Sequence, residues 1–272
     1  YEALCTTDYT DVPVIEVDTN RADLTTKEWE RRASILGFRS GQSLDPETEA
    51  IELVSDGVRN VLLVGPPRTG KSYSAQRVAA SYLGCDVNNL NDAAYTEVQF
   101  HHGWTYGDFI RKMIPTTTPD GDLVFRDQAG RFLEHCLAHP GKSVFVIEEI
   151  NRANVQEVFG EAFHLVDPGY RGKPLKLASA GVDDDSPTSL VVPEGLLLLA
   201  TLNDVDRGTF PVDFAFLSRF ASVPFRPRYD VAAEALKNRG WAQADTLTLL
   251  EALGSVGDLT GYHVGHAYVL DL

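Results

Sequence analysis

The chain has 272 residues, of which 43% are apolar and 23% are charged, and this is the composition of an ordinary globular protein of one or two domains. No stretch of about 18 apolar residues is present, so we expect no membrane-spanning helix. The formal net charge of -15 makes the chain poorly suited to neutralising a nucleic-acid backbone. We therefore expect any nucleic acid to be held mainly by something other than this chain.

The cysteines favour a reducing environment. Cys5, Cys85 and Cys136 are odd in number and show no metal-ligand or disulfide-framework spacing, so a cytoplasmic location is expected. The chain begins at Tyr1 without a methionine and shows no signal peptide. These features predict a fragment of a longer protein.

The first predicted elements lead to a short buried strand. Residues 24–36 and 46–56 have acidic first turns and apolar spacings of three and four, which predict two flanking helices. The apolar run Val61–Val64 predicts a buried strand that stops at Gly65. A helix is expected over Lys71–Leu83.

Apolar runs that end in polar residues alternate with helical segments through the middle of the chain. Strands are expected at Val144–Ile147, before Glu148-Glu149, and at Leu196–Ala200. Helices are expected at about 127–138 and 153–166. This alternation predicts an α/β fold in which helices cover a parallel sheet, with ligands at the carboxyl ends of its strands.

The pattern becomes helical after Pro224 and Pro227, over 230–238 and 246–253. The predicted parts are therefore an N-terminal flanking segment over 1–45, an α/β domain over 46–225, and the start of a small helical lid over 226–272.

The segment between the first strand and the next helix matches the phosphate-binding pattern GxxxxGK[ST]. Its glycines allow backbone N–H groups to wrap a polyphosphate at the positive end of a helix. Lys71 is predicted to reach the β- and γ-phosphates, and the Ser72 hydroxyl to ligate Mg²⁺. The residues predicted to bind nucleotide are Gly65, Pro66, Pro67, Arg68, Thr69, Gly70, Lys71, Ser72 and Tyr73.

Two adjacent carboxylates follow the strand at 144–147. Glu148 is predicted to support Mg²⁺ together with Ser72, and Glu149 to polarise the attacking water as a general base. Neighbouring carboxylates can divide these roles because successive side chains of a strand point in opposite directions. The usual first residue of such a pair is Asp, so Glu148 is a longer substitute.

Other chemistries find little support. His101 and His102 cannot face one metal from a strand, so packing and local hydrogen bonds are expected for them and for Trp104, with contacts from a loop to the substrate as the alternative. No GxSxG, HExxH or Cys/His pattern is present, so nucleophilic catalysis finds no support, and because no PD-type nuclease pattern is present either, no DNA cleavage is predicted in this chain.

Together with the phosphate loop, further motifs resemble McrB-type AAA+ proteins, the nucleotide-hydrolysing motor subunits of modification-dependent restriction systems. The strings that carry the resemblance are Phe100-His101, Tyr106–Phe109, Glu149–Asn154, Asn203–Arg207, Phe214–Phe220 and Val264–Tyr268. The resemblance spans roughly Asn60 to Tyr268. The sequence departs from the family at two places, with Glu148-Glu149 in place of Asp-Glu and Asn203-Asp-Val-Asp206-Arg207 in place of Asn-Thr-Ala-Asp-Arg.

The resemblance implies an AAA+ P-loop domain that uses Mg²⁺ with GTP or ATP as substrate. It also implies a homo-oligomeric ring, by resemblance a hexamer, a McrC-like endonuclease subunit as partner, and recognition of DNA by a missing N-terminal domain. Asn203 would align the lytic water, and Arg219 would act as an arginine finger on the next subunit. Asp206 and Arg207 would carry the family signature near the subunit boundary.

Alternatives remain open at this point. A MoxR or dynein-related AAA+ chaperone would use the same nucleotide chemistry, and a nucleotide-locked scaffold would follow if Glu148 could not hold metal. Asn203 is also compatible with a turn residue, Arg219 with a structural arginine, and Asp206 and Arg207 with a surface ion pair.

Overall fold

The computed structural model describes residues 45–177, 187–204, 210, 212–241, 246, 249–250, 252–254 and 265–270. The predicted helix at 24–36 lies outside them, and the predicted helix at 246–253 lies only partly within them. No helix in these ranges is long and apolar enough to cross a membrane. The two boundaries between the three predicted parts stay predictions.

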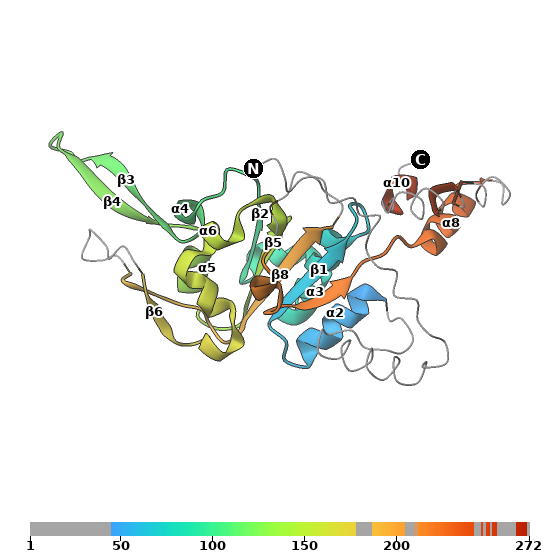
Figure 1. Cartoon of the computed structure of the whole chain (residues 1–272), viewed down its shortest axis with the longest axis horizontal. Helices are drawn as coiled ribbons and strands as arrows, with labels where there is room; N and C mark the ends of the chain where they lie inside the picture. The colour runs from blue at the N-terminus through green and yellow to red at the C-terminus, as the bar shows by residue number, and fades with distance from the viewer. Residues whose placement is uncertain are drawn as a thin grey trace, which may run out of the picture. The chain divides into compact units, whose positions relative to one another are not determined.

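A five-stranded parallel sheet forms the centre of the described part, in the order β2-β5-β8-β1-β9 (Figure 1). Its strands are β1 (Asn60–Gly65), β2 (Tyr95–Gln99), β5 (Ser143–Glu148), β8 (Leu196–Asn203) and β9 (Ala221–Pro224). The register pairs Gly65 with Asn203 and Ile147 with Ala200, so β1, β5 and β8 end at one edge. The predicted parallel α/β class is confirmed.

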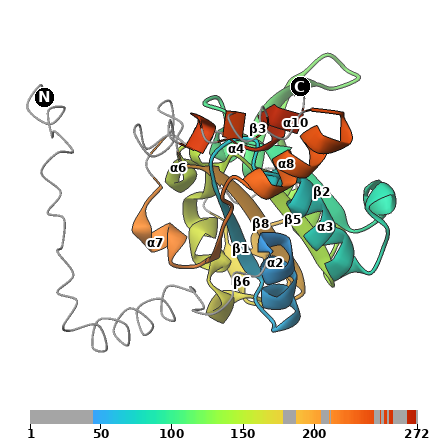
Figure 2. The ribbon, with the colours of Figure 1, turned by 90° about the vertical axis from the view of Figure 1, so that its right-hand side faces the viewer.

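Helices cover both faces of the sheet, as Figure 2 shows for α2 and α3 on one side and α6 on the other. Val61 and Leu63 pack in one apolar cluster with α2 and α3, whereas Leu62 packs in the other. This alternation is the period of two that a strand imposes on its side chains. The helices are α2 (Pro46–Ser55), α3 (Lys71–Leu83), η3 (Val87–Asp92), α4 (Tyr106–Phe109), α5 (Arg131–Ala138), η4 (Ile150–Arg152), α6 (Val155–Phe159), η5 (Gly160–Val166) and η6 (Pro168–Tyr170).

The helix predicted at 127–138 is wrong in its first turn, because the chain is a strand as far as Ala129. α5 begins only after Gly130, whose N–H donates to the Ile110 carbonyl at 2.7 Å. A Cβ at Gly130 would lie 2.4 Å from the Phe109 carbonyl carbon, so only glycine fits at this close approach of two backbones.

The helix predicted at 153–166 is also divided. Its first part is α6, which ends at Phe159, and its second part is the 3₁₀ helix η5. Gly160 separates them with a φ of +50° and a ψ of -131°, a conformation that no α-helix contains. The Tyr106 ring packs against Gly160 where a side chain would otherwise lie.

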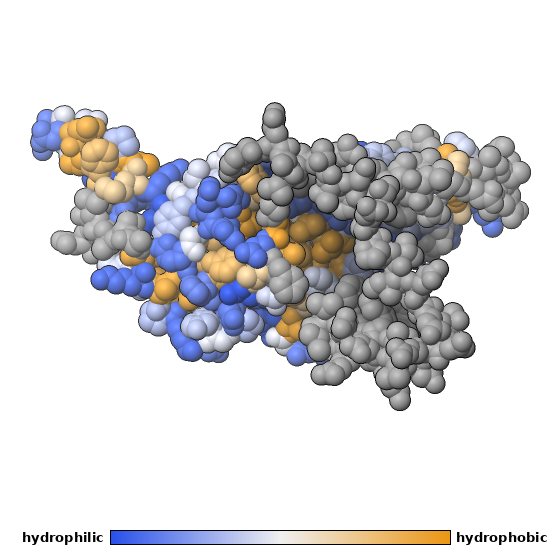
Figure 3. Space-filling view, viewed as in Figure 1, coloured by the Kyte–Doolittle hydropathy of each residue, from blue (hydrophilic) through white to orange (hydrophobic). Residues whose placement is uncertain are grey.

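An antiparallel hairpin that sequence reasoning missed lies between α4 and α5. Its strands are β3 (Arg111–Thr117) and β4 (Leu123–Ala129), which pair only with each other. Met113, Leu123 and Phe125 are 49%, 67% and 50% exposed on it, and Figure 3 shows apolar surface on this ribbon. A second short hairpin pairs β6 (Pro174–Lys176) with β7 (Ser189–Val191).

Beyond the sheet edge, α7 (Phe214–Leu217) leads into β9, and α8 (Tyr229–Asn238) and α10 (Ala267–Leu270) follow it. Ala232 and Leu236 of α8 pack with Val269 of α10 in a third apolar cluster, separate from the two that flank the sheet. The backbone N–H of Ala267 donates to the Arg68 carbonyl at 3.2 Å. The last described segment therefore contacts the loop that follows β1.

Candidate functional site

The loop after β1 has the geometry that its glycines predict. Gly70 caps α3 with a left-handed φ of +91°, a conformation in which a side chain would be strained. Gly65 is needed for space, because a Cβ there would lie 2.0 Å from the Phe225 carbonyl oxygen. α3 begins at Lys71, as predicted, so its N-terminal N–H groups face the loop.

Lys71 is held by the carbonyl groups of its own loop. It is 6% exposed, and its Nζ donates to the Gly65 oxygen at 2.7 Å and to the Pro66 oxygen at 2.6 Å. Burial lowers the pKa of Lys71 to about 8, although the nearby carboxylates of Asp204, Glu148 and Glu149 act in the opposite direction. A polyphosphate in the loop could replace the two carbonyl oxygens as the acceptor for this ammonium group.

Glu148 joins α3 to the ends of β5 and β8. Its Oε2 accepts from Ser72 Oγ at 2.8 Å and from Thr201 Oγ1 at 2.6 Å. Burial raises the pKa of Glu148, the two hydroxyl donors partly offset this, and Glu97 and Glu149 raise it further. The Ser72 hydroxyl and the Glu148 carboxylate are adjacent hard oxygen donors, which fits Mg²⁺ bound by few protein ligands together with water and phosphate.

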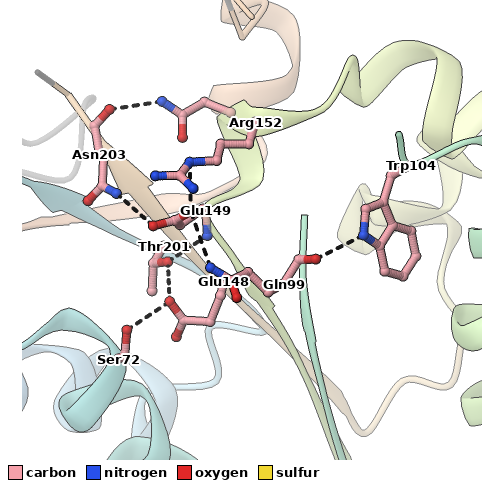
Figure 4. Close-up of polar contacts among 9 residues, drawn as sticks. Ser72, Gln99, Trp104, Glu148, Glu149, Arg152, Thr201 and Asn203 are labelled. Carbon is pink, nitrogen blue, oxygen red and sulfur yellow. Dashed lines mark hydrogen bonds and ion pairs between the residues drawn. The ribbon is translucent and has the colours of Figure 1, made fainter. Parts of the chain in front are cut away.

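Glu149 has a separate set of partners, drawn in Figure 4. Its N–H donates to Thr201 Oγ1 at 2.9 Å, and its Oε1 accepts from Asn203 Nδ2 at 3.2 Å. Its Oε2 lies 2.7 Å from Arg152 Nε and 3.3 Å from Gln99 Nε2. The two glutamates therefore occupy different positions around one threonine.

The division between Glu148 and Glu149 does not arise from strand alternation as predicted. β5 ends at Glu148, and Glu149 has a φ of +55° and a ψ of +50°, in the left-handed region. This conformation is rare for a residue with a Cβ and costs on the order of 1 kcal/mol or more. It turns the Glu149 carboxylate toward Asn203 and away from the Ser72–Glu148 pair.

Asn203 is the last residue of β8 and is 8% exposed. Its backbone carbonyl accepts from Asn151 Nδ2 at 2.8 Å, while its side-chain amide donates to Glu149. Because β8 lies between β1 and β5, Asn203 stands between the loop and the carboxylates.

These groups surround one cavity of about 350 Å³. Its lining consists of Pro67, Arg68, Gly70, Lys71, Ser72, Tyr73, Glu148, Glu149, Thr201, Asn203 and Ala267. Most predicted nucleotide-binding residues and both predicted carboxylates therefore line one space at the carboxyl ends of adjacent strands.

Arg219 lies elsewhere. Its carbonyl accepts from the side chain of Asn60, the first residue of β1, so it lies at the amino ends of the strands. The loop at Gly65 begins five residues further along this strand, a separation of about 16 Å. The Arg219 side chain packs on the Phe163 ring of its own chain and donates to the Ala215 carbonyl, and its role toward a neighbouring subunit stays a prediction.

Asp206 and Arg207 lie outside the described residues. The histidines make local contacts: His101 Nδ1 accepts from the Gly103 N–H at 3.0 Å, and the His102 ring lies 5.5 Å from that of Phe210. Within the described ranges, no cluster of three or more His, Cys, Asp or Glu residues could hold a metal.

Sequence reasoning missed several contributors to the site. Thr201 was placed after its strand, yet it lies in β8 and touches both glutamates. Gln99 and Arg152, which reach the Glu149 carboxylate, follow from no spacing rule. The sequence signal that could have identified Arg152 was its place in the string Glu149–Asn154, which carries the family resemblance. Tyr268 lies with its ring 4.6 Å from the Arg68 guanidinium.

Comparisons with a family model and with known protein sequences agree on the kind of protein that this chain resembles. A family model described as AAA domain (dynein-related subfamily) matches residues 60–220. The chain is 32% identical over 176 residues to the type IV methyl-directed restriction enzyme EcoKMcrB subunit of Escherichia coli, covering 63% of this chain and 36% of that protein. It is 30% identical over 200 residues to the YdiS component of the type II restriction enzyme BsuMI of Bacillus subtilis, covering 60% of this chain and 56% of that protein.

Among solved structures, NtrX from Brucella abortus in complex with ATP is 13% identical, with a TM-score of 0.43, over 80% of this chain and 47% of that one. The chain spans between about a third and just over half the length of the two curated relatives.

Proposed function

The chain belongs to the dynein-related subfamily of AAA domains, and its similarity to two restriction components confirms the resemblance to McrB-type AAA+ proteins. From this premise we propose that it hydrolyses GTP or ATP with Mg²⁺ and acts as a motor subunit for an endonuclease partner in modification-dependent restriction. The observation that carries the proposal is the convergence of Lys71, Ser72, Glu148, Glu149 and Asn203 around one cavity.

In the proposed reaction, water attacks the γ-phosphoryl group in line with the leaving β-phosphate oxygen. Glu149 accepts the proton of that water, and Asn203 holds the Glu149 carboxylate in place. Lys71 neutralises charge on the β- and γ-phosphates. Ser72 and Glu148 would hold Mg²⁺, which would supply further neutralisation of phosphate charge.

We propose that Arg219 completes the site of a neighbouring subunit in a ring, by resemblance a hexamer. Its position at the amino ends of the strands supports this role, because it is remote from the phosphate loop of its own chain. A planar, permanently charged guanidinium suits charge that develops on the γ-phosphoryl group. We also propose that Asp206 and Arg207 lie near the boundary between two subunits.

The division of labour with partners also belongs to the proposal. The chain carries a net charge of -15, which favours DNA contact through a McrC-like endonuclease or through an N-terminal domain outside this sequence. The cytoplasmic location that the cysteines favour is part of the same proposal.

A chaperone that remodels protein complexes is the second candidate function. The observation in its favour is that the matching family model is the dynein-related subfamily, which is not restricted to restriction systems by its description. The nucleotide site would work in the same way in both cases.

Phosphate release with GTP and with ATP, in the presence and absence of Mg²⁺, tests the hydrolase proposal. We expect turnover with at least one of them and none without Mg²⁺. Competition between the two decides the base, because the phosphate loop contacts groups that all triphosphates share. Adding a McrC-like endonuclease and methylated DNA should stimulate the rate. Stimulation by a protein substrate alone would favour the chaperone.

A further inference from the structure

We propose that Asn60 is a positioning residue for Arg219, and that the Phe163 ring is the surface on which the Arg219 guanidinium is held. This inference rests on the proposed role of Arg219 on the neighbouring subunit. Neither Asn60 nor Phe163 lines the nucleotide cavity of its own chain.

Asn60 joins two segments that are far from it in sequence. The residue is 2% exposed at the start of β1, and its Nδ2 donates to the Val166 carbonyl at 2.6 Å and to the Arg219 carbonyl at 2.9 Å. Both protons of its amide group are therefore used. One side chain fixes the backbone of Arg219 relative to the end of η5.

Arg171 determines which way the Asn60 amide points. An Nη2 proton of Arg171 is donated to Asn60 Oδ1. Because a guanidinium only donates and a carbonyl only accepts, the reverse orientation of the amide would lose all three bonds. Arg171 is itself fixed by bonds to the carbonyl groups of Arg59, Pro193 and Leu196.

η5 carries the surface on which Arg219 packs. The Arg219 guanidinium carbon lies 4.5 Å from the centroid of the Phe163 ring, a cation–π arrangement. Phe163 is three residues before Val166, whose carbonyl is the other acceptor of Asn60. The same amide therefore sets the positions of the arginine backbone and of the ring beneath its side chain.

A purely structural role would have a different consequence. Buried polar groups stabilise a fold wherever they are satisfied, so loss of Asn60 would then weaken the whole domain, including its own phosphate loop. A positioning role affects the site of the neighbour and leaves nucleotide binding in the same chain intact. The two roles can be separated by asking which subunit carries the defect.

The test uses Asn60→Asp, which keeps the volume and the acceptor for Arg171 but replaces the donor by a carboxylate oxygen that faces two carbonyl groups. We expect nucleotide affinity within about twofold of the parent and hydrolysis at least tenfold slower. Mixing with Lys71→Ala subunits should restore turnover, since intact phosphate loops would then face intact fingers. Arg219→Ala serves as the reference and should be restored in the same way.

The Phe163→Leu variant tests the ring without altering β1. It should lower the hydrolysis rate and be restored by Lys71→Ala subunits, and Phe163→Tyr, which keeps the aromatic face, should retain most of the rate. If Asn60→Asp loses nucleotide binding through misfolding, this pair decides the proposal.

Parental rates for both Asn60→Asp and Phe163→Leu would overturn the inference. The inference would also be overturned if Asn60→Asp and Phe163→Leu were slow and mixing with Lys71→Ala subunits restored the turnover of Arg219→Ala but not of these two variants. In that case the arginine-finger proposal would survive alone. Failure to restore Arg219→Ala itself would overturn both.

Discussion

The Nζ of Lys71 lies 2.7 Å from the carbonyl oxygen of Gly65, so the lysine is bound within the loop whose phosphate ligand it is proposed to contact. Binding of a triphosphate must exchange this bond, and the bond to Pro66, for phosphate oxygens. A charge-assisted bond to an anion is stronger than one to a neutral carbonyl. The exchange therefore favours triphosphate binding.

Lys71→Ala should lose tight triphosphate binding. The lost charge-assisted contact is worth on the order of 1.5 to 3 kcal/mol, which corresponds to about a 10- to 150-fold weaker affinity. Titration with fluorescent GTP and ATP analogues measures it. Lys142→Ala is the matched control, because Lys142 lies 4.6 Å from the Tyr82 ring and outside the cavity lining. Unchanged affinity for both nucleotides in Lys71→Ala would contradict the phosphate-loop assignment.

Triphosphate affinity should fall as the pH rises above about 8. The pKa of Lys71 is lowered by burial to about 8 in the free protein, and phosphate in contact would raise it again. Below pH 8 the ammonium is already charged, whereas above it binding must take up a proton, which weakens affinity by up to about tenfold per pH unit. Titration of the parent and of Lys71→Met between pH 7 and 9.5 measures this, and equal pH dependence of the two would assign it to another group.

Local patterns predict well the edge of the sheet where the strands end and the cavity lies. The start of α3 at Lys71 could be predicted because the phosphate-binding pattern leads into a helix, and the ends of β1 and β5 because their apolar runs give way to Gly65 and to Glu148-Glu149. The parallel register then brings these ends together without further information.

Other features depend on contacts that no local pattern contains. The bond between Asn60 and Arg171 joins residues 111 positions apart. The β3–β4 hairpin was missed because Pro115 lies within its first strand, and a proline argues against a strand except at the edge of a sheet. In a two-stranded ribbon both strands are edges, so the proline is tolerated there. The left-handed conformation of Glu149 likewise follows from Thr201 and Asn203, not from its neighbours in sequence.

Glu149→Gln should bind nucleotide and fail to hydrolyse it, and it should accumulate the assembled ring. The amide keeps the shape and an acceptor for Asn203 but cannot take a proton from water. Phosphate release and mass photometry in the presence of nucleotide measure the two effects. Turnover at the parental rate would move the role of general base to Glu148 or to another group.

Gly265→Ala should increase the rate of nucleotide dissociation at least about tenfold, with little change in the melting temperature of the nucleotide-free protein. A Cβ at Gly265 would lie 2.2 Å from the Pro67 oxygen and 2.4 Å from the Arg68 oxygen, so the segment that carries Ala267 must move away from the loop. Ala267 lines the cavity, and Tyr268 packs on Arg68, so both contacts would be disturbed together.

Gly254→Ala is the matched control for this variant, because among the described residues, apart from its chain neighbours and its own helix backbone, no atom lies within 4 Å of its added Cβ. It makes the same chemical change in the same C-terminal part of the chain, and it should release nucleotide at the parental rate. Stopped-flow displacement of a fluorescent analogue compares the three proteins. If Gly265→Ala and Gly254→Ala released nucleotide equally fast, the contact between this segment and the phosphate loop would have no part in retaining nucleotide. A faster release confined to Gly265→Ala would instead show that the close backbone approach at Pro67 and Arg68 retains it.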